Sequence, residues 1–235
     1  MGTTADAPCV GFVPLSLHGA HETSMSASAD LELARLLEHP AIWRGRSAAR
    51  AETLATGHAA LDGWLPGRGW PRTGLIEILV SRFGVGELYL LLPLLATLTG
   101  RPAARWCVWI APPLEPYAPA LVSHGVTLER VLVVRAREPL WAFEQTLGSG
   151  ASDVALAWAA QSPRARAIRR LQLAAERGKG LGFLFRPYRA SRESSPAMLR
   201  IAVESISTGV RLTLLKSRGG ARGSIDLNWP IAFGS

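Results

Sequence analysis

The architecture of this chain follows from one stretch, Ile76-Glu77-Ile78-Leu79-Val80-Ser81-Arg82-Phe83-Gly84-Val85-Gly86-Glu87-Leu88. An apolar run of strand length leads into a turn with two glycines and then into an apolar, helix-like run, which is the layout of a phosphate-binding loop. In a working loop, backbone N–H groups surround the phosphates, a Lys neutralises them, and the next Ser or Thr holds magnesium. Here Glu87 and Leu88 follow Gly86, and Ser81 stands where the first glycine belongs.

These replacements oppose nucleotide binding. At an effective dielectric of about 20, a carboxylate about 4 Å from a phosphate is repelled by roughly 4 kcal/mol, where a Lys would be attracted by a similar amount. That difference is worth several decades of affinity. Leu88 offers magnesium no oxygen. We therefore predict a degenerate nucleotide site, with a plain strand-to-helix turn as the alternative; its residues in this stretch are Ser81, Gly84, Gly86, Glu87 and Leu88.

Apolar runs of strand length alternate with helical patterns on both sides of this stretch, which is typical of a parallel sheet with crossover helices. Strands are predicted at 75–80, 106–111, 131–134, 154–158 and 181–185. Helices are predicted at 87–99, 116–124 and 139–148. Beyond residue 186, shorter alternating segments at 199–205, 210–215 and 224–227 indicate antiparallel strands added at one edge. The expected fold class is α/β, with a mainly parallel, RecA-like sheet.

The organisation along the chain predicts one main domain. Residues 1–29 lack apolar periodicity and are expected to be disordered, because such a tail cannot offset its ordering entropy by burial. Residues 30–50 are expected to form a short helix and a linker, and residues 51–235 the core domain. The short helix needs a docking surface, since it is marginal alone. Its interface residues would be Leu33, Leu36 and Leu37, together with Trp43 in the linker.

Composition excludes several classes of protein. Two cysteines, Cys9 and Cys107, give no disulfide framework and no metal-ligand spacing, which fits a reducing cytoplasm. The start of the chain lacks a signal-peptide pattern, and the most apolar stretch, 88–98, is too short to span a bilayer. The five histidines are scattered and no Gly-x-Ser-x-Gly elbow occurs, so we predict neither catalysis, nor a metal, nor a cofactor.

Positive charge is concentrated in one segment. Residues 161–192 contain nine basic residues and one acidic residue, so this segment alone equals the formal net charge of +8 of the whole chain. Arg binds phosphate bidentately and stacks on bases, which favours contact with single-stranded nucleic acid or a partner. A solvated surface is the alternative. The residues concerned are Arg164, Arg166, Arg169, Arg170, Arg177, Lys179, Arg186, Arg189 and Arg192.

If residues 164–177 are helical, Arg166, Arg170 and Arg177 share one stripe. The apolar residues of this helix would then face the core; they are Ala165, Ile168, Leu171 and Ala175.

Five further segments resemble the ImuA proteins, which are bacterial translesion-synthesis accessory proteins related to the division inhibitor SulA. The segments are His39-Pro40-Ala41-Ile42-Trp43-Arg44, Thr56-Gly57-His58-Ala59-Ala60-Leu61-Asp62, Leu65-Pro66-Gly67-Arg68-Gly69-Trp70-Pro71, Trp109-Ile110-Ala111-Pro112-Pro113 and Pro116-Tyr117-Ala118-Pro119-Ala120-Leu121. The similarity runs from about residue 38 to 230. It implies a RecA-like core.

The resemblance strengthens the argument against catalysis. Trp158 stands at the position that resembles the magnesium-coordinating Asp of such cores, and Pro112 or Pro113 at that of the water-activating Glu. Together with Glu87 and Leu88, these are the positions from which phosphoryl transfer takes its phosphate clamp, its metal ligand and its water-positioning base, and none of them keeps the required residue. The expectation is a core without ATP hydrolysis. The resemblance also places the basic segment where RecA-like proteins hold single-stranded DNA.

The function implied is that of a non-catalytic accessory protein of the SOS DNA-damage response. It would support error-prone translesion synthesis by binding RecA, a polymerase-like partner (ImuB) and an error-prone replicative-type polymerase. Single-stranded DNA is a further expected partner. Leu33, Leu36, Leu37 and Trp43 would dock on RecA or pack on the chain's own core. Two alternatives are a SulA-like division inhibitor that binds the tubulin-like protein FtsZ, and an ATPase with an unusual loop.

Overall fold

The structure, a computed structural model, describes residues 52–84, 86–159, 161–217 and 222–228. The predictions made for residues 1–29 and 30–50 lie outside these ranges, and so do Leu33, Leu36, Leu37 and Trp43.

An eight-stranded mixed sheet organises the core, with the order β10-β9-β8-β3-β7-β6-β4-β5. Six neighbouring strands, from β8 to β5, run parallel, and β9 and β10 are added antiparallel, each to its neighbour. The strands are β3 (Gly74–Val80), β4 (Trp106–Ile110), β5 (Val131–Val134), β6 (Ser152–Trp158), β7 (Leu181–Pro187), β8 (Leu199–Ile206), β9 (Gly209–Lys216) and β10 (Gly223–Asn228). This confirms the α/β class and the antiparallel C-terminal edge.

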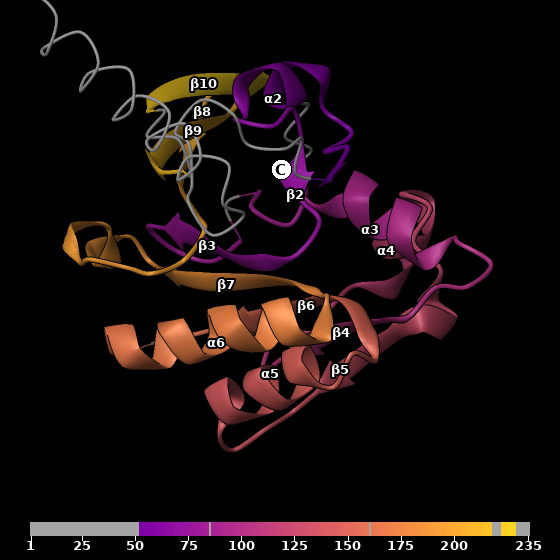
Figure 1. The fold of residues 1–235 in the computed structure, drawn as a ribbon. Helices are drawn as coiled ribbons and strands as arrows, with labels where there is room; N and C mark the ends of the chain where they lie inside the picture. The colour runs from indigo at the N-terminus through magenta and orange to yellow at the C-terminus, as the bar shows by residue number, and fades with distance from the viewer. Residues whose placement is uncertain (1–51, 85, 160, 218–221, 229–235) are drawn as a thin grey trace, which may run out of the picture. The chain divides into compact units, whose positions relative to one another are not determined.

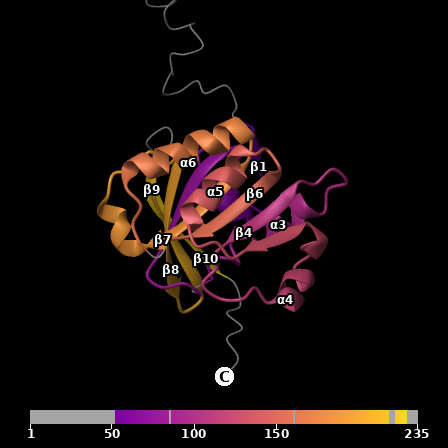
Figure 2. The same ribbon diagram turned by 90° about the horizontal axis from the view of Figure 1, so that it is seen from below.

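Helices cover both faces of the sheet (Figure 1). On one face lie α2 (Ala59–Trp64), α3 (Leu92–Thr99) and α4 (Ala118–Ser123); on the other lie α5 (Pro139–Gly148) and α6 (Ala165–Gly178). Figure 2 shows α5 and α6 side by side along the strands. Short connections complete the core: a two-stranded sheet of β1 (Thr53–Leu54) and β2 (Trp70–Pro71), and the 3-10 helices η1 (Leu128–Arg130) and η2 (Tyr188–Arg192).

Strand β3 is buried along its whole length, as expected for the centre of a parallel sheet covered on both faces. Its side chains alternate between the faces. Ile76 and Ile78 join the larger apolar cluster under α2 and α3, whereas Leu75 joins the cluster under α5 and α6. Glu77 points to the same face as Leu75, which places a carboxylate inside the core.

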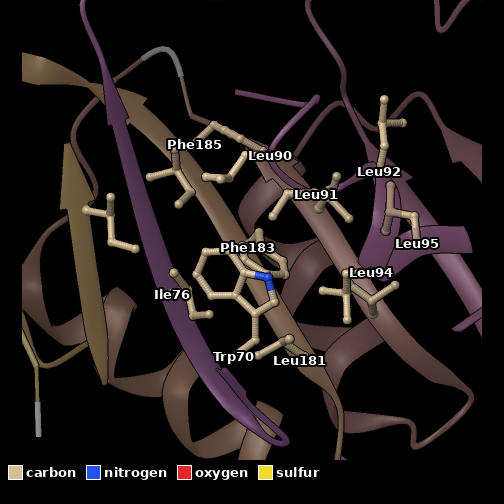
Figure 3. Packing of buried hydrophobic residues seen from close by; sticks show 14 of the residues in the cluster. Trp70, Ile76, Leu90, Leu91, Leu92, Leu94, Leu95, Leu181, Phe183 and Phe185 are labelled. Carbon is tan, nitrogen blue, oxygen red and sulfur yellow. The ribbon is translucent and has the colours of Figure 1, made fainter. Parts of the chain in front are cut away.

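The larger cluster contains aromatic side chains from four strands, β2, β4, β6 and β7. Figure 3 shows Trp70 of β2 with Phe183 and Phe185 of β7. Trp70 meets Phe183 edge to face, with ring centroids 5.4 Å apart and an interplanar angle of 89°. Leucines of α3 pack over this pair, among them Leu94 and Leu95. Their burial, at about 25 cal/mol per Å², is the main stabilising contribution on this face.

Candidate functional site

The turn after β3 is closed from within by the carboxylate of Glu87. Oε1 of Glu87 accepts a hydrogen bond from the backbone N–H of Gly84 at 2.7 Å, and the residue is only 2% exposed. Gly84 and Gly86 have φ of 84° and 101°, in the region that favours glycine, so the turn has the backbone freedom to curl around an anion. The Gly84 N–H of this turn is thus already bonded to a carboxylate of the protein itself.

This geometry corrects the expected orientation of Glu87. The sequence argument placed the carboxylate in an open cradle, where it would repel an incoming phosphate; instead it is buried and already bonded to the turn. A phosphate would have to displace it from the Gly84 N–H as well as overcome its charge. Ser81 is exposed and Leu88 is half-buried against the larger apolar cluster.

The helix after the turn begins later than predicted. The pattern predicted a helix over 87–99, but α3 starts at Leu92, and residues 87–91 form turns. Pro93 explains the difference, because a helix starting at 87 would need an N–H from Pro93 to the carbonyl of Tyr89. With Leu92 as the first residue, Pro93 stands where no N–H is needed. The positive end of the helix dipole is therefore displaced from the glycine turn.

Trp158, at the end of β6, fills the position expected for a magnesium ligand with an apolar ring. It is 5% exposed and stacks on Phe185 with centroids 4.7 Å apart and planes 12° apart. The ring centroid of Trp109, in β4, lies 5.8 Å from that of Trp158. Pro112 and Pro113 follow β4, half-buried and exposed respectively. The end of β6 thus holds an aromatic stack.

The basic segment separates into an exposed helical face and one buried residue. In α6, Ile168, Leu171 and Ala175 are buried as predicted. Ala165 is exposed, which is a correction: it lies in the first turn, beyond the contact with the sheet. The exposed basic residues are Arg164, Arg166, Arg169, Arg170, Arg177, Lys179, Arg189 and Arg192.

Two of these arginines contact the neighbouring helix α5. Arg170 donates to both carboxylate oxygens of Glu144, at 3.1 Å and 2.5 Å. The guanidinium of Arg177 lies over Gly148, where a built Cβ would be 2.5 Å from Nη2. Leu173, with 49% of its surface exposed, lies one helical turn from Arg169, Arg170 and Arg177. The outer face of α6 therefore presents one exposed apolar side chain, Leu173, surrounded by arginines.

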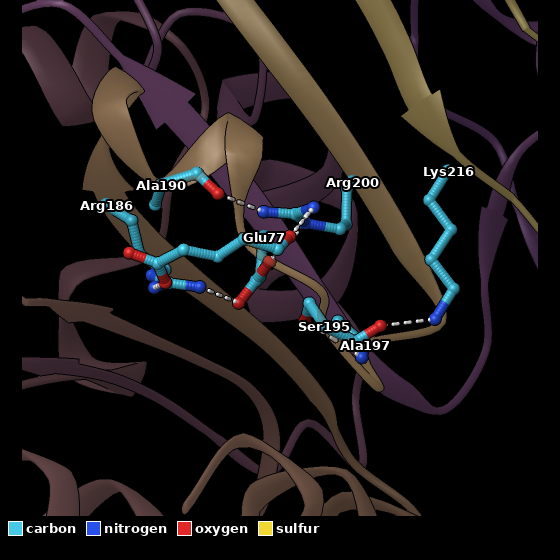
Figure 4. Close-up of polar contacts among 8 residues, drawn as sticks. Glu77, Arg186, Ala190, Ser195, Ala197, Arg200 and Lys216 are labelled. Atoms are coloured by element: carbon cyan, nitrogen blue, oxygen red, sulfur yellow. Dashed lines mark hydrogen bonds and ion pairs between the residues drawn. The ribbon is translucent and has the colours of Figure 1, made fainter. Parts of the chain in front are cut away.

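Arg186 was predicted to contact nucleic acid or a partner, and this is wrong for the structure described here. Its side chain is completely buried. Nη1 donates to Oε1 of Glu77 at 2.6 Å (Figure 4). Nη2 donates to Oε2 of Glu193 at 2.6 Å. The guanidinium neutralises a carboxylate inside the core, because an unpaired charge there would cost several kcal/mol.

Arg200 completes an ionic cluster, which we define as the buried Glu77, Arg186 and Arg200 together with the exposed Glu193. Nε of Arg200 donates to Oε2 of Glu77 at 2.6 Å, and its other nitrogens donate to the carbonyls of Glu193 and Ala190 at 2.8 and 2.7 Å. Desolvation works against ionisation of the Glu193 carboxyl, but the hydrogen bond and charge of Arg186 hold its pKa below the ordinary value. The cluster fixes η2, and with it the exposed side chains of Arg189 and Arg192.

Sequence reasoning missed this cluster, although one signal was present. Glu77 interrupts an apolar strand, and a buried carboxylate requires partners. Neither a metal site nor a membrane span emerges from the described part of the chain: no cluster of at least three His, Cys, Asp or Glu lies there, and no helix is long and apolar enough to cross a bilayer.

Comparisons with known proteins find similar chains among the SulA and ImuA proteins. A family model described as cell division inhibitor SulA matches residues 75–182. ImuA of Caulobacter vibrioides (strain NA1000 / CB15N) is 32% identical over 155 residues, which are 62% of this chain and 63% of that protein. SulA of Yersinia pestis (strain Pestoides F) is 31% identical over 135 residues, 54% of this chain and 79% of that protein.

A solved structure is also similar in sequence. SulA from Pseudomonas aeruginosa is 28% identical, with a TM-score of 0.40, and the match covers 48% of this chain and 97% of that one. The chain spans somewhat less than two thirds of the ImuA relative that it matches. Its coverage of the Yersinia protein is more complete. The chain therefore belongs to the family of the cell division inhibitor SulA, and it is also similar to ImuA.

Proposed function

We propose that this chain is a non-catalytic accessory protein of the SOS DNA-damage response, which supports error-prone translesion DNA synthesis by holding partners together. The observation that carries the proposal is the Glu87 carboxylate bonded inside the glycine turn of a RecA/SulA-like core. The similarity to ImuA over 155 residues supports the lesion-bypass role.

Loss of ATP hydrolysis follows from three features of the site. The phosphate-binding turn already holds an anion, the helix dipole begins at Leu92, and an indole stacked on Phe185 stands where a metal ligand is needed. Phosphoryl transfer depends on positioned cations around the phosphates, and none of these features supplies one. We therefore assign the fold a binding role.

The partners proposed are RecA, a polymerase-like ImuB, an error-prone replicative-type polymerase and single-stranded DNA. On the core, the proposed contact surface is the exposed basic face of α6 and η2. Leu173 supports a protein partner, since an exposed apolar side chain ringed by arginines has the composition of an interface anchor. The N-terminal segment, with Leu33, Leu36, Leu37 and Trp43, remains the proposed docking element for RecA.

Charge reversal tests the basic face. Arg164, Arg166 and Arg169 are exposed and make no ion pair with the described residues, so changing all three to Glu should leave the fold intact. Arg170 is left unchanged because its removal would leave the carboxylate of Glu144 without its ion-pair partner. A matched control reverses three exposed arginines elsewhere, namely Arg82, Arg137 and Arg222.

The readouts are pull-down of RecA and the polymerase-like partner, and binding of single-stranded DNA at several salt concentrations. If about five arginines contact phosphates, DNA affinity should fall roughly a hundredfold between about 50 and 200 mM salt. The triple variant should lose binding and the control should keep it. Equal binding by both variants would remove the basic face from the proposal.

A second candidate is inhibition of cell division through FtsZ. It is favoured by the SulA family model over 75–182 and by the 79% coverage of the Yersinia SulA. Overproduction of the chain in bacteria would then make the cells grow as long filaments, and the purified chain would capture FtsZ. A pull-down against RecA, the polymerase-like partner and FtsZ side by side separates the two candidates.

A further inference from the structure

Two adjoining hollows lie at the amino ends of the parallel strands, at the sheet edge opposite the glycine turn. The first, the apolar pocket, has a volume of about 310 Å³ and walls that include Leu65, Pro71 and Met198. The second, the cationic cleft, has a volume of about 900 Å³ and is lined in part by Arg72, Arg101 and Lys179. Both share Glu52, Arg72 and Thr73, so the two hollows adjoin, and we refer to them together as the groove.

The cationic cleft has unpaired positive charge. Arg105 also lines it, but its Nε donates to Oδ1 of Asp153 at 2.9 Å, so this pair neutralises itself. The side chains of Arg72, Arg101 and Lys179 make no hydrogen bond or ion pair with any residue that the structure describes. The remaining acidic group is the exposed Glu52. Three cations against one carboxylate attract an anionic ligand.

The apolar pocket selects the kind of anion. Its volume lies at the lower end of the range for binding pockets, and Met198 gives it an adaptable wall. Among the described residues, no aromatic side chain lines either hollow. Nucleic-acid bases would therefore find no stacking platform, whereas one large aliphatic side chain would fit.

We propose that this groove binds an extended acidic segment of a partner protein, with one aliphatic side chain in the apolar pocket and carboxylates against Arg72, Arg101 and Lys179. The proposal is independent of the nucleotide site, and it shares only Lys179, the C-cap of α6, with the basic residues proposed above to contact DNA or a partner. Charge complementarity sets the register of the peptide, and burial of its aliphatic side chain supplies the anchor. Single-stranded nucleic acid is the competing occupant that the test must separate.

The test is a selection of random dodecapeptides displayed on phage against the immobilised full-length chain. Enriched peptides should share acidic residues around an aliphatic one. The best peptide is then synthesised with fluorescein, and its affinity is measured by fluorescence polarisation. A double variant, Arg72→Glu with Lys179→Glu, should weaken binding at least about tenfold, because two attractions become repulsions.

Further variants probe the pocket and the specificity. Met198→Gln should weaken the peptide about fivefold or more, since it removes the apolar wall at nearly constant size. The control Arg166→Glu with Arg169→Glu, on α6, should leave peptide affinity within about twofold. Circular-dichroism melting checks the fold, and Arg72→Gln with Lys179→Gln replaces the reversal if that variant unfolds.

Three outcomes would overturn the proposal. One is the absence of enriched peptides, or enrichment without acidic residues. Another is equal loss of peptide binding in the groove and α6 variants, which would indicate general electrostatic attraction. The third is that oligo-dT of about 20 nucleotides binds, loses affinity in the groove variant and displaces the peptide, which would assign the groove to nucleic acid.

Discussion

Replacing Glu77 by Gln should destabilise the core severely, because it leaves two buried guanidiniums with too little negative charge. Both Glu77 and Arg186 are completely buried, and Glu77 pairs with Arg186 and Arg200 at 2.6 Å. Removing one partner of a buried ion pair costs about 3–5 kcal/mol. For a core of this size, each kcal/mol lowers Tm by about 2–4 °C, so the expected loss is about 6–20 °C.

The assay is urea unfolding followed by tryptophan fluorescence, with circular dichroism as a second probe. Glu115→Gln is the matched control, since Glu115 pairs with Arg135 on the exposed surface and should lose less than about 1 kcal/mol. Adding Arg186→Met to Glu77→Gln should cost less than the sum of the single changes, because the two sites are coupled. A loss below about 1 kcal/mol for Glu77→Gln would refute the role given to the ionic cluster.

The remaining predictions concern other parts of the core. Gly178→Ala should destabilise by about 1–3 kcal/mol in urea, because a Cβ there would lie 1.9 Å from the carbonyl oxygen of Leu147, whereas Gly63→Ala, with nothing within 4 Å, should be neutral or stabilising. Burial raises the pKa of Cys107 to about 12, so in a Cys9→Ser background iodoacetamide should label Cys107 only on unfolding; prompt labelling of the native chain would contradict this. Burial lowers the pKa of His58 below its ordinary value, so the unfolded chain binds more protons than the folded one below about pH 6.5, and the free energy of unfolding should fall as pH drops. The variant His58→Gln should reduce this fall between about pH 7.5 and 5.5. An unchanged dependence of the unfolding free energy on pH would argue against the shift at His58.

Local patterns predicted the central elements of the fold well. Strand β5 and helix α5 lie where the sequence placed them, at 131–134 and 139–148, and β6 and β7 differ by two residues at one end. These segments are apolar runs bounded by turn residues, so local preference and tertiary structure agree. The two-residue strands β1 and β2 escaped notice because they carry no periodicity.

Contacts between distant residues could not be predicted in the same way. Arg186 was counted with a surface cluster because its neighbours in sequence are basic, but its partner Glu77 lies 109 residues away. The late start of α3 depends on Pro93, whose effect on the helix was not weighed against the apolar pattern. The bond of Glu87 to the Gly84 N–H could not be predicted from the sequence, because it depends on the path of the turn.

The most direct test of the closed nucleotide turn is a titration of the purified full-length chain with magnesium–ATP by calorimetry, together with an assay for phosphate release. We expect no binding of ATP up to millimolar concentration and no turnover, because the Glu87 carboxylate already accepts the hydrogen bond of the Gly84 N–H. Micromolar affinity with turnover that is lost in Glu87→Ala would contradict it.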